Sequence, residues 1–559
     1  MPSAERFQDC SRAVDAIIEQ TGARISLALP LGLGKPNHLV NALVARAIDG
    51  ELDQLEIFTA LSLGVPGVDH PLERRLMEPI AERIYEGWES LDYVDLRARG
   101  ELPDNIRIHE FYFSPGEMLG NDRAQQEYKS VNYTDALREI LESKPNLVMQ
   151  LAAPAGDGRL DLSCNTDLTL DLFEAVGNAD DRPLFAAQVN RRLPAMGGRA
   201  EVATEMFDVV LDDPAYDYEL FSLPSLPPGD AEYAIGLRTA ALIRDGGTLQ
   251  VGIGNQGAAV CWAAMLRDQH PETFAHMLDD LGTTAQTRAL IERIGGLDSF
   301  DEGLYASTEM LVEGILQMYL AGLIRRRVFD DLDAQRRALA GDTPDEAGAA
   351  IHAGFFLGSE RFYQLLRDLD DHQRDEVRMT SVNFTNLLYG DEELKRAQRR
   401  QARFVNQAMN VTLLGAVASD TLPDGQVVSG VGGQYEFVSM AHALGDGRAL
   451  LTLESTRGAG DQATSNIVWS HEQPTLPRHL RDIVVTEYGV ADLRGKSDRG
   501  VVEALIEIAD SRFQEELAER ARAAGKLPRD YRVPEHARQN TPERLSEALA
   551  PYRRGGEIP

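Results

Sequence analysis

The segment Gly303–Tyr319 (GLYASTEMLVEGILQMY) holds a glutamate in a position where its carboxylate could act as a nucleophile. The pattern predicts a short strand at Leu304–Ala306, a Ser-Thr turn and then an amphipathic helix with apolar residues at helical spacing. Glu309 would then lie at the N-terminus of a helix, where the helix dipole favours an ionised carboxylate. An ionised carboxylate at the end of a strand could attack a substrate covalently. The alternative is that Glu309 has no catalytic role and only stabilises the helix by interacting with its dipole.

A second segment, Ser429–Phe437 (SGVGGQYEF), is rich in glycine. Glycines let the backbone approach a ligand closely and turn its N–H groups toward an oxyanion. The pattern does not match the dinucleotide-binding or phosphate-loop sequences. A tight turn without a ligand is the alternative interpretation.

A third segment, Val484–Ser497 (VVTEYGVADLRGKS), predicts a strand followed by a loop. The strand would deliver Glu487, a second carboxylate, at its end. Arg494 and Lys496 follow, and this basic pair could either meet phosphate groups or simply solvate a turn.

Two further glycine-rich turns follow predicted strands, at Gly32–His38 and at Gly252–Gly257 (GIGNQG). A turn between a strand and a helix can offer backbone N–H groups to a phosphate, but such turns are common. In the helix expected at Ala258–Leu266, Cys261 fits a core position better than a catalytic one. No His/Cys cluster has the spacing of metal ligands, so we expect no metal site.

The elements that must position these segments alternate between strands and helices, which predicts an α/β fold with open, largely parallel sheets. The segment Leu220–Asp230 (LFSLPSLPPGD) contains three prolines and a glycine, a composition that is typical of a linker. We therefore expect two α/β domains, at residues 1–225 and 231–511, and a helical C-terminal appendage at residues 512–559. Later strands are expected at Ile351–Leu357, Met379–Val382, Val411–Ala418, Ala449–Leu453 and Ile483–Thr486.

Composition narrows the possible partners. The formal net charge of −33 disfavours binding to nucleic acid or to an anionic membrane surface. We expect neither a signal peptide nor a membrane-spanning helix, because no apolar run is long enough. The chain has three cysteines without redox spacing, which favours a reducing compartment and a cytoplasmic location.

Taken together, four segments resemble the acetyl-CoA hydrolase/transferase family, a branch of the class I CoA-transferases. They are Leu29–Leu43 (LPLGLGKPNHLVNAL), the GIGNQG turn together with STEM at Ser307–Met310, SGVGGQYEF and VVTEYGVADLRGKS. The sequence departs from many members of the family at Gly257, where proline is frequent, and at Glu436, where aspartate is frequent.

The resemblance implies two α/β domains with the active site between them, and it assigns the catalytic glutamate to Glu309. It also implies oxyanion-stabilising backbone amides at Ile253 and at Gly432 or Gly433. Its active-site asparagine is matched to Asn383, with Asn386 nearby in SVNFTN. A further site glutamate is matched to Glu487. Candidates for contacts with coenzyme A are Gly252, Gly254, Lys35, Arg494 and Lys496.

The function implied is CoA transfer from an acyl-CoA to a small carboxylate such as acetate, through a glutamyl-CoA thioester on Glu309. Coenzyme A is then a substrate, and no permanently bound cofactor or metal is needed. The resemblance also implies a homodimer. Two alternatives stay open: an acyl-CoA thioester hydrolase with the same fold, and a CoA-binding protein without catalytic activity.

Overall fold

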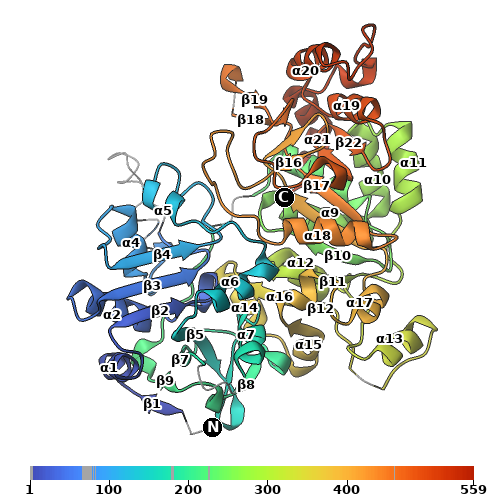
Figure 1. Ribbon diagram of the computed structural model, residues 1–559. Helices are drawn as coiled ribbons and strands as arrows, with labels where there is room; N and C mark the ends of the chain where they lie inside the picture. Colours follow the sequence, from blue (N-terminus) through green and yellow to red (C-terminus); the bar gives the residue numbers. More distant parts are fainter. Residues whose placement is uncertain are drawn as a thin grey trace.

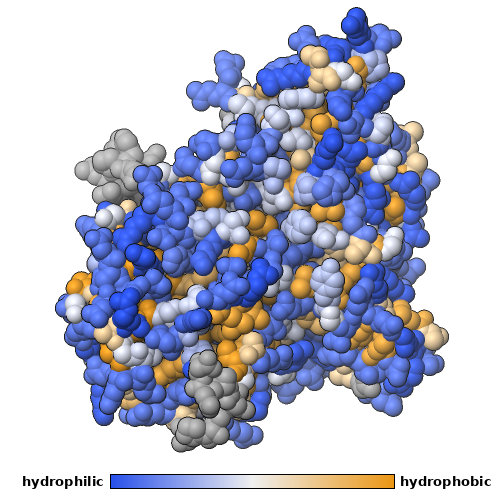
Figure 2. Space-filling view, in the orientation of Figure 1, coloured by the Kyte–Doolittle hydropathy of each residue, from blue (hydrophilic) through white to orange (hydrophobic). Residues whose placement is uncertain are grey.

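Two large β-sheets flanked by helices make up most of the molecule (Figure 1). The structure is a computed structural model, and it describes residues 4–65, 79, 81, 83–177, 182–224, 227–345, 347–458 and 460–559. The predicted α/β architecture with largely parallel sheets is confirmed. Polar residues dominate the face of the molecule that Figure 2 shows, with smaller apolar areas between them.

The first sheet has the strand order β1-β9-β7-β5-β2-β3-β4, and all of these neighbours are parallel. The short strands β6 and β8 join it by antiparallel pairing at β5. Its strands are β1 (Glu5–Phe7), β2 (Arg24–Ala28), β3 (Gln54–Thr59), β4 (Ile106–Glu110), β5 (Leu147–Pro154), β6 (Arg159–Asp161), β7 (Leu184–Val189), β8 (Glu201–Ala203) and β9 (Val209–Leu211). The associated helices are α1 (Cys10–Thr21), α2 (Asn37–Ile48), α4 (Asp92–Ala98), α5 (Asp122–Gln126), α6 (Ala136–Glu142) and α7 (Thr169–Val176).

The second sheet has the order β13-β12-β11-β10-β14-β17-β21-β22 and is parallel except for β22 at its edge. Its strands are β10 (Thr248–Val251), β11 (Tyr305–Leu311), β12 (Ile351–Phe356), β13 (Val377–Met379), β14 (Arg403–Gln407), β17 (Arg448–Thr452), β21 (Ile483–Thr486) and β22 (Gly489–Asp492). Two small sheets contain β15 (Asn410–Thr412), β16 (Val417–Ala418), β18 (Thr456–Arg457), β19 (Thr464–Ser465) and β20 (Ile467–Val468).

Helices of the second half surround this sheet. They are α8 (Asp230–Ala240), α9 (Asn255–Gln269), α10 (Pro271–Asp280), α11 (Ala285–Ile294), α12 (Glu313–Leu320), α13 (Leu332–Leu339), α14 (Glu360–Arg367), α15 (Asp371–Glu376), α16 (Val382–Asn386), α17 (Glu392–Gln398), α18 (Gln434–Ala443), α19 (Asp498–Glu507), α20 (Ser511–Ala523) and α21 (Pro542–Gly555). The last of them is tied to the body of the molecule, because Arg553 pairs with Asp230 and the Tyr552 hydroxyl donates to Asp280.

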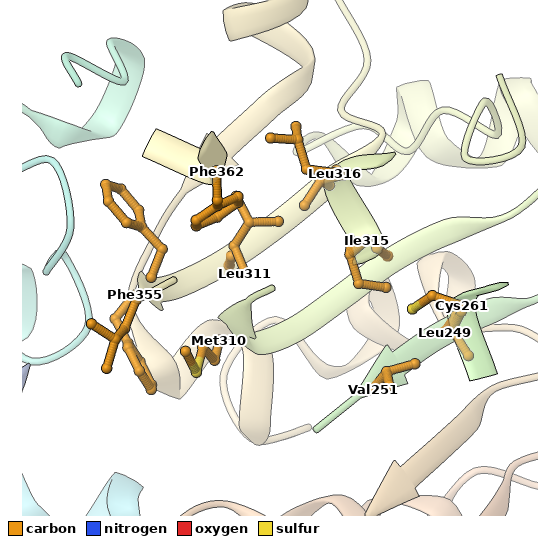
Figure 3. Packing of buried hydrophobic residues seen from close by; sticks show 14 of the residues in the cluster. Leu249, Val251, Cys261, Met310, Leu311, Ile315, Leu316, Phe355 and Phe362 are labelled. Atoms are coloured by element: carbon orange, nitrogen blue, oxygen red, sulfur yellow. The ribbon is translucent and has the colours of Figure 1, made fainter. Parts of the chain in front are cut away.

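The strands form where the chain carries short apolar runs, because parallel strands covered on both faces bury nearly every side chain. All six residues of β7 and of β12 are buried, for example. Around β11, Figure 3 shows Met310 and Leu311 packed beside Phe355 and Phe362, with Cys261 of α9 near Leu249 and Val251 of β10. Cys261 is therefore a core residue, and burial raises the pKa of its thiol to about 12.

Three details of the expected secondary structure were wrong. The strand expected at Met379–Val382 lies earlier, as β13 (Val377–Met379), and Val382 begins the helix α16. The strand that carries Glu309 does not end at Ala306, because the parallel ladder with β12 continues through Thr308, Met310 and Leu311. Strand pairing thus overrides the helix-capping tendency of Ser307 and Thr308, and α12 begins only at Glu313. Similarly, the segment expected as one strand at Val411–Ala418 forms the antiparallel pair β15 and β16.

No helix in the described ranges is long and apolar enough to cross a membrane. Residues 225 and 226, inside the expected linker, lie outside the described residues. The division into three domains stays a prediction.

Candidate active site

Glu309 lies on β11, an interior strand of the second sheet, and borders a cavity of about 1650 Å³. The cavity is bounded by both halves of the chain. The first half contributes Leu61, Phe111, Tyr112 and Tyr133, among others. The second half contributes the two glycine-rich turns at residues 252–253 and 429–433. Part of the Glu309 surface remains open to this space, so a ligand in the cavity could reach its carboxylate.

Asn386, at the end of α16, links Glu309 to a second carboxylate. Its Nδ2 donates to Oε2 of Glu309 at 2.6 Å and to Oε2 of Glu436 at 2.7 Å. The hydroxyl of Thr385 donates to the amide oxygen at 2.9 Å, which fixes the orientation of the amide. Because an amide nitrogen has two protons, Asn386 can serve both carboxylates at once.

The structure therefore brings Asn386, and not Asn383, to Glu309. The Nδ2 of Asn383 donates to Asp171 of α7 at 2.5 Å, in a different environment. The two asparagines are three residues apart on one short helix, where side chains are neighbours along one face. Sequence spacing alone could not decide between them, and the assignment to Asn383 is corrected to Asn386.

The glycine-rich turn at residues 430–433 packs directly against Glu309. A Cβ at Gly433 would lie 2.0 Å from Oε2 of Glu309, so only glycine fits there. Gly432 has a φ of +56°, and a Cβ on it would lie 3.5 Å from Oε1 of the same carboxylate. Among the described residues, the backbone N–H groups of Gly432 and Gly433 make no hydrogen bond. They could donate to an oxyanion on a bound substrate.

The other glycine-rich turn opens on the same cavity. Gly252 and Ile253 line it, and Ile253 is 47% exposed. Gly254 follows with a φ of +115° at the start of α9, next to the side chain of Gln407. In the described part of the chain the Ile253 N–H also has no hydrogen-bond partner. Both turns expected from the sequence thus border the cavity that contains Glu309.

The surroundings of Glu309 disfavour its ionised form, whereas the sequence predicted that they would favour it. Its pKa is raised to about 8, first by burial, then by the nearby charge of Glu436, and further by Asp167. The hydrogen bond from Asn386 opposes this rise. Because Glu309 lies within a strand, no helix dipole favours its ionised form, and that expectation was wrong.

Glu436 is itself held from the first half of the chain. Its Oε1 accepts hydrogen bonds from the backbone N–H of Thr134 at 2.9 Å and from the Thr134 hydroxyl at 2.5 Å. Burial raises the pKa of Glu436, and these hydrogen bonds oppose the rise. Sequence reasoning noted Glu436 only as a departure from the family pattern, and it did not single out Thr134. No local signal predicts this pair, because 302 residues separate the two.

Four other expected site residues lie away from this cavity. Lys35 is fully buried, and its ammonium group donates to the backbone oxygens of Ala60 and Leu61. Burial lowers the pKa of Lys35 to about 7, so it is unsuited to meet the phosphates of coenzyme A. The assignment of Lys35 as a CoA contact is therefore corrected.

Glu487, Arg494 and Lys496 border a separate cavity of about 700 Å³, beside β22 and α19. Glu487 follows β21, which is four strands from β11, or about 19 Å at the usual strand spacing of ~4.8 Å. Its carboxylate accepts from the backbone N–H and the hydroxyl of Ser455. The resemblance matched Glu487 to a site glutamate, and Arg494 and Lys496 were candidates for contacts with coenzyme A, but the sequence does not reveal how far apart two strands lie in a sheet.

Comparisons with known proteins agree with this architecture. Residues 358–521 match the model of the acetyl-CoA hydrolase/transferase C-terminal domain. The 4-hydroxybutyrate coenzyme A transferase of Clostridium kluyveri is 27% identical over 349 residues, which cover 61% of this chain and 65% of that protein. The succinyl-CoA:cyclohexane-1-carboxylate CoA transferase of Geobacter metallireducens is 26% identical over 348 residues, covering 61% of this chain and 64% of that protein.

Solved structures share the fold over nearly the whole chain. RipA from Yersinia pestis has a TM-score of 0.66 at 20% identity, covering 93% of this chain and 100% of that chain. The 4-hydroxybutyrate CoA-transferase of Porphyromonas gingivalis has a TM-score of 0.59 at 19% identity, and the match covers 92% of this chain and 97% of that chain.

The fold is that of the CoA-transferases. The match to the C-terminal-domain model and to the two CoA transferases confirms the resemblance to the acetyl-CoA hydrolase/transferase family. The chain spans slightly less than two thirds of the length of the two curated relatives described above.

Proposed function

We propose that this protein transfers CoA from an acyl-CoA thioester to a free carboxylate, with Glu309 as the covalent nucleophile. The observation that carries the proposal is the environment of Glu309. Its carboxylate borders a cavity of about 1650 Å³, accepts a hydrogen bond from Asn386 and touches a glycine turn with unused N–H groups. The names of the curated relatives, which are CoA transferases, support the same activity.

In the first step, an oxygen of the Glu309 carboxylate attacks the carbonyl carbon of the thioester. The C–S bond breaks, CoA leaves as a thiolate, and an acyl-glutamyl anhydride forms. The backbone N–H groups of Ile253 and of Gly432 or Gly433 are the proposed donors to the oxyanion, where charge develops in the transition state. Only the ionised form of Glu309 attacks, so the proton that its raised pKa retains must be lost before this step.

In the second step, the thiolate attacks the carbonyl carbon of Glu309 and releases the first acid as a carboxylate. The product is a glutamyl-CoA thioester, which retains the energy of the original bond. The incoming carboxylate then reverses both steps, so that CoA leaves on the new acyl group and Glu309 is regenerated. We propose that Asn386 donates to the oxyanion formed on the Glu309 carbonyl, because its Nδ2 already lies 2.6 Å from Oε2.

Hydrolysis of the glutamyl-CoA thioester is the competing outcome. Glu487, the second carboxylate that the sequence places at a strand end, could act as a general base for water, but it borders the separate smaller cavity. We therefore favour transfer over hydrolysis.

A single assay separates the candidate functions. Acyl-CoA species and free CoA are followed by chromatography after the protein is mixed with acetyl-CoA, with and without a panel of carboxylates. We expect a new acyl-CoA in the same amount as the acetyl-CoA lost, with ping-pong initial rates. Free CoA released at the same rate with every acid would indicate a hydrolase. Binding without consumption of acetyl-CoA would indicate a protein that only binds CoA.

A further inference from the structure

Next to Glu309 the cavity has an aromatic wall, made of Phe111, Tyr133 and Phe355. The ring centroids of Phe111 and Tyr133 are 5.6 Å apart, and those of Tyr133 and Phe355 are 5.8 Å apart. All three border the cavity, although each is almost completely buried. Tyr133 links the wall to Glu309, because the Glu309 charge contributes to the raised pKa of the Tyr133 hydroxyl. Phe355 pairs in register with Met310, the next residue of β11. Figure 3 shows Phe355 and Met310 side by side.

This wall presents carbon surface to a ligand. The only polar group on its three side chains is the Tyr133 hydroxyl, and that hydroxyl already donates to Asp167. Leu31 and Leu61 extend the apolar lining. A surface of this kind favours a hydrocarbon chain, since burying each methylene group is worth about a fourfold gain in binding.

The charges around the wall are negative. Glu436 shares Asn386 with Glu309, and the Asp167 carboxylate accepts from Tyr133 at the wall itself. Both carboxylates act on Glu309 strongly enough to raise its pKa. A second carboxylate on a substrate would therefore enter a region that already repels negative charge.

Positive charge near the wall is already paired. The cationic side chains among the described residues that line the cavity are Arg97 and Arg99. Arg97 is buried and lies 2.5 Å from Glu110, and exposed Arg99 lies 2.8 Å from Glu101. Neither offers an unpaired cation to the far end of an acyl chain.

Building on the proposed function, we propose that the transferred acyl group is an uncharged, apolar chain. The wall of Phe111, Tyr133 and Phe355 receives the chain and discriminates against dicarboxylic acids of the same length.

The test compares acceptors of equal carbon number, with acetyl-CoA as the saturating donor. The pairs are butyrate with succinate and hexanoate with adipate, and kcat/KM is measured for each acid by the formation of its CoA thioester. We expect each monocarboxylate to exceed its matched dicarboxylate at least tenfold, and we expect butyrate to exceed acetate about 16-fold, from about fourfold for each of its two additional methylene groups. Succinate equal to or better than butyrate would overturn the inference while leaving CoA transfer intact. If no acid yields a thioester, the proposed function fails and the inference fails with it.

Two substitutions of Phe355 test whether the aromatic wall is responsible for the selectivity. In Phe355→Ala and in the milder Phe355→Leu, the butyrate/acetate ratio of kcat/KM should fall several-fold, because the chain loses its contact surface. The ratio does not depend on how much of the variant is folded. The matched control is Tyr389→Ala, which removes an aromatic ring that is 79% exposed and should leave the ratio unchanged. An unchanged ratio in both Phe355 variants would contradict the proposed role of the wall.

Discussion

Asn386 donates both protons of its amide nitrogen to carboxylates, one on Glu309 and the other on Glu436. This arrangement holds two acidic groups close together, so the charge of Glu436 disfavours the ionisation of Glu309. Thr134 donates two hydrogen bonds to Glu436, and these favour its ionised form. For Glu309 the hydrogen bond from Asn386 does not offset burial and the charges of Glu436 and Asp167, and its pKa is raised to about 8. The residue proposed as the nucleophile is thus protonated in a substantial fraction of molecules at neutral pH.

This network predicts the pH dependence of the reaction. Because only ionised Glu309 can attack, kcat/KM for the acyl-CoA should rise with pH and level off above about pH 8. In Glu436→Gln the neighbouring negative charge is removed, so the pKa of Glu309 should fall and the curve should move to lower pH. Glu472→Gln, at an exposed position, serves as the control. A profile in Glu436→Gln that coincides with the wild-type profile would contradict this coupling.

Among single residues and short segments, the sequence predicted Glu309 and both glycine-rich turns as candidates for the site, because each has a distinctive local pattern. It could not predict the pKa of Glu309, which depends on burial and on Glu436 and Asp167. Nor could it choose Asn386 over Asn383, because that choice depends on how α16 packs. The roles of these residues stay predictions.

Among the elements, the turn at residues 430–433 is the most constrained. It leads into α18, and its glycines let the backbone reach the Glu309 carboxylate and the segment around Phe111 and Tyr112. A side chain at Gly430 would lie 2.6 Å from the backbone oxygen of Phe111. The turn therefore brings the first half of the chain, the second sheet and the proposed oxyanion donors together.

Gly433→Ala tests this close approach. The added methyl group overlaps Oε2 of Glu309 and Nδ2 of Asn386, so it should displace the carboxylate. We expect turnover to fall by about 100-fold or more, because a displacement of the attacking carboxylate by about 1 Å can cost this much. Acyl-CoA affinity should change much less, as measured by equilibrium binding. Gly445→Ala, just after the same helix, meets no atom within 4 Å and should keep normal turnover. Normal turnover in Gly433→Ala would mean that the turn only connects two elements.

The strands were predictable because most are short buried apolar runs. The extent of β11 was not, since its last residues are held by pairing with β12 rather than by their own preference. The basic residues near strand ends were misassigned for a related reason. Lys35, Arg494 and Lys496 follow strands, but burial and strand order decide which cavity each can reach.

At the scale of the whole molecule, the two sheets share one hydrophobic core. A single cluster of buried residues includes Leu151 and Phe185 from the first sheet together with Leu249, Ile351 and Val485 from the second. Members of this cluster from both halves, including Phe111, Tyr133 and Met310, line the cavity of the proposed active site, so its geometry depends on both halves of the chain. The cytoplasmic location and the homodimer stay predictions.

The shared core predicts that the two halves unfold together. Thermal unfolding followed by calorimetry should show one main transition, because separating the halves would expose apolar surface of both. Thr134→Val removes one hydrogen bond between the halves and should lower the transition temperature without splitting it. Two well-separated transitions in the wild-type protein would contradict a shared core.

The most direct test of the account is to trap the covalent intermediate. The protein is incubated with acyl-CoA alone, treated with borohydride and digested for peptide mass spectrometry. Borohydride reduces a thioester to an alcohol, so we expect inactivation and a mass change on Glu309 that corresponds to reduction of its carboxyl group. Glu309→Gln, treated in the same way, should show no change at residue 309. A wild-type protein that turns over acyl-CoA without any modification of Glu309, or with modification of Cys261 instead, would contradict the central claim.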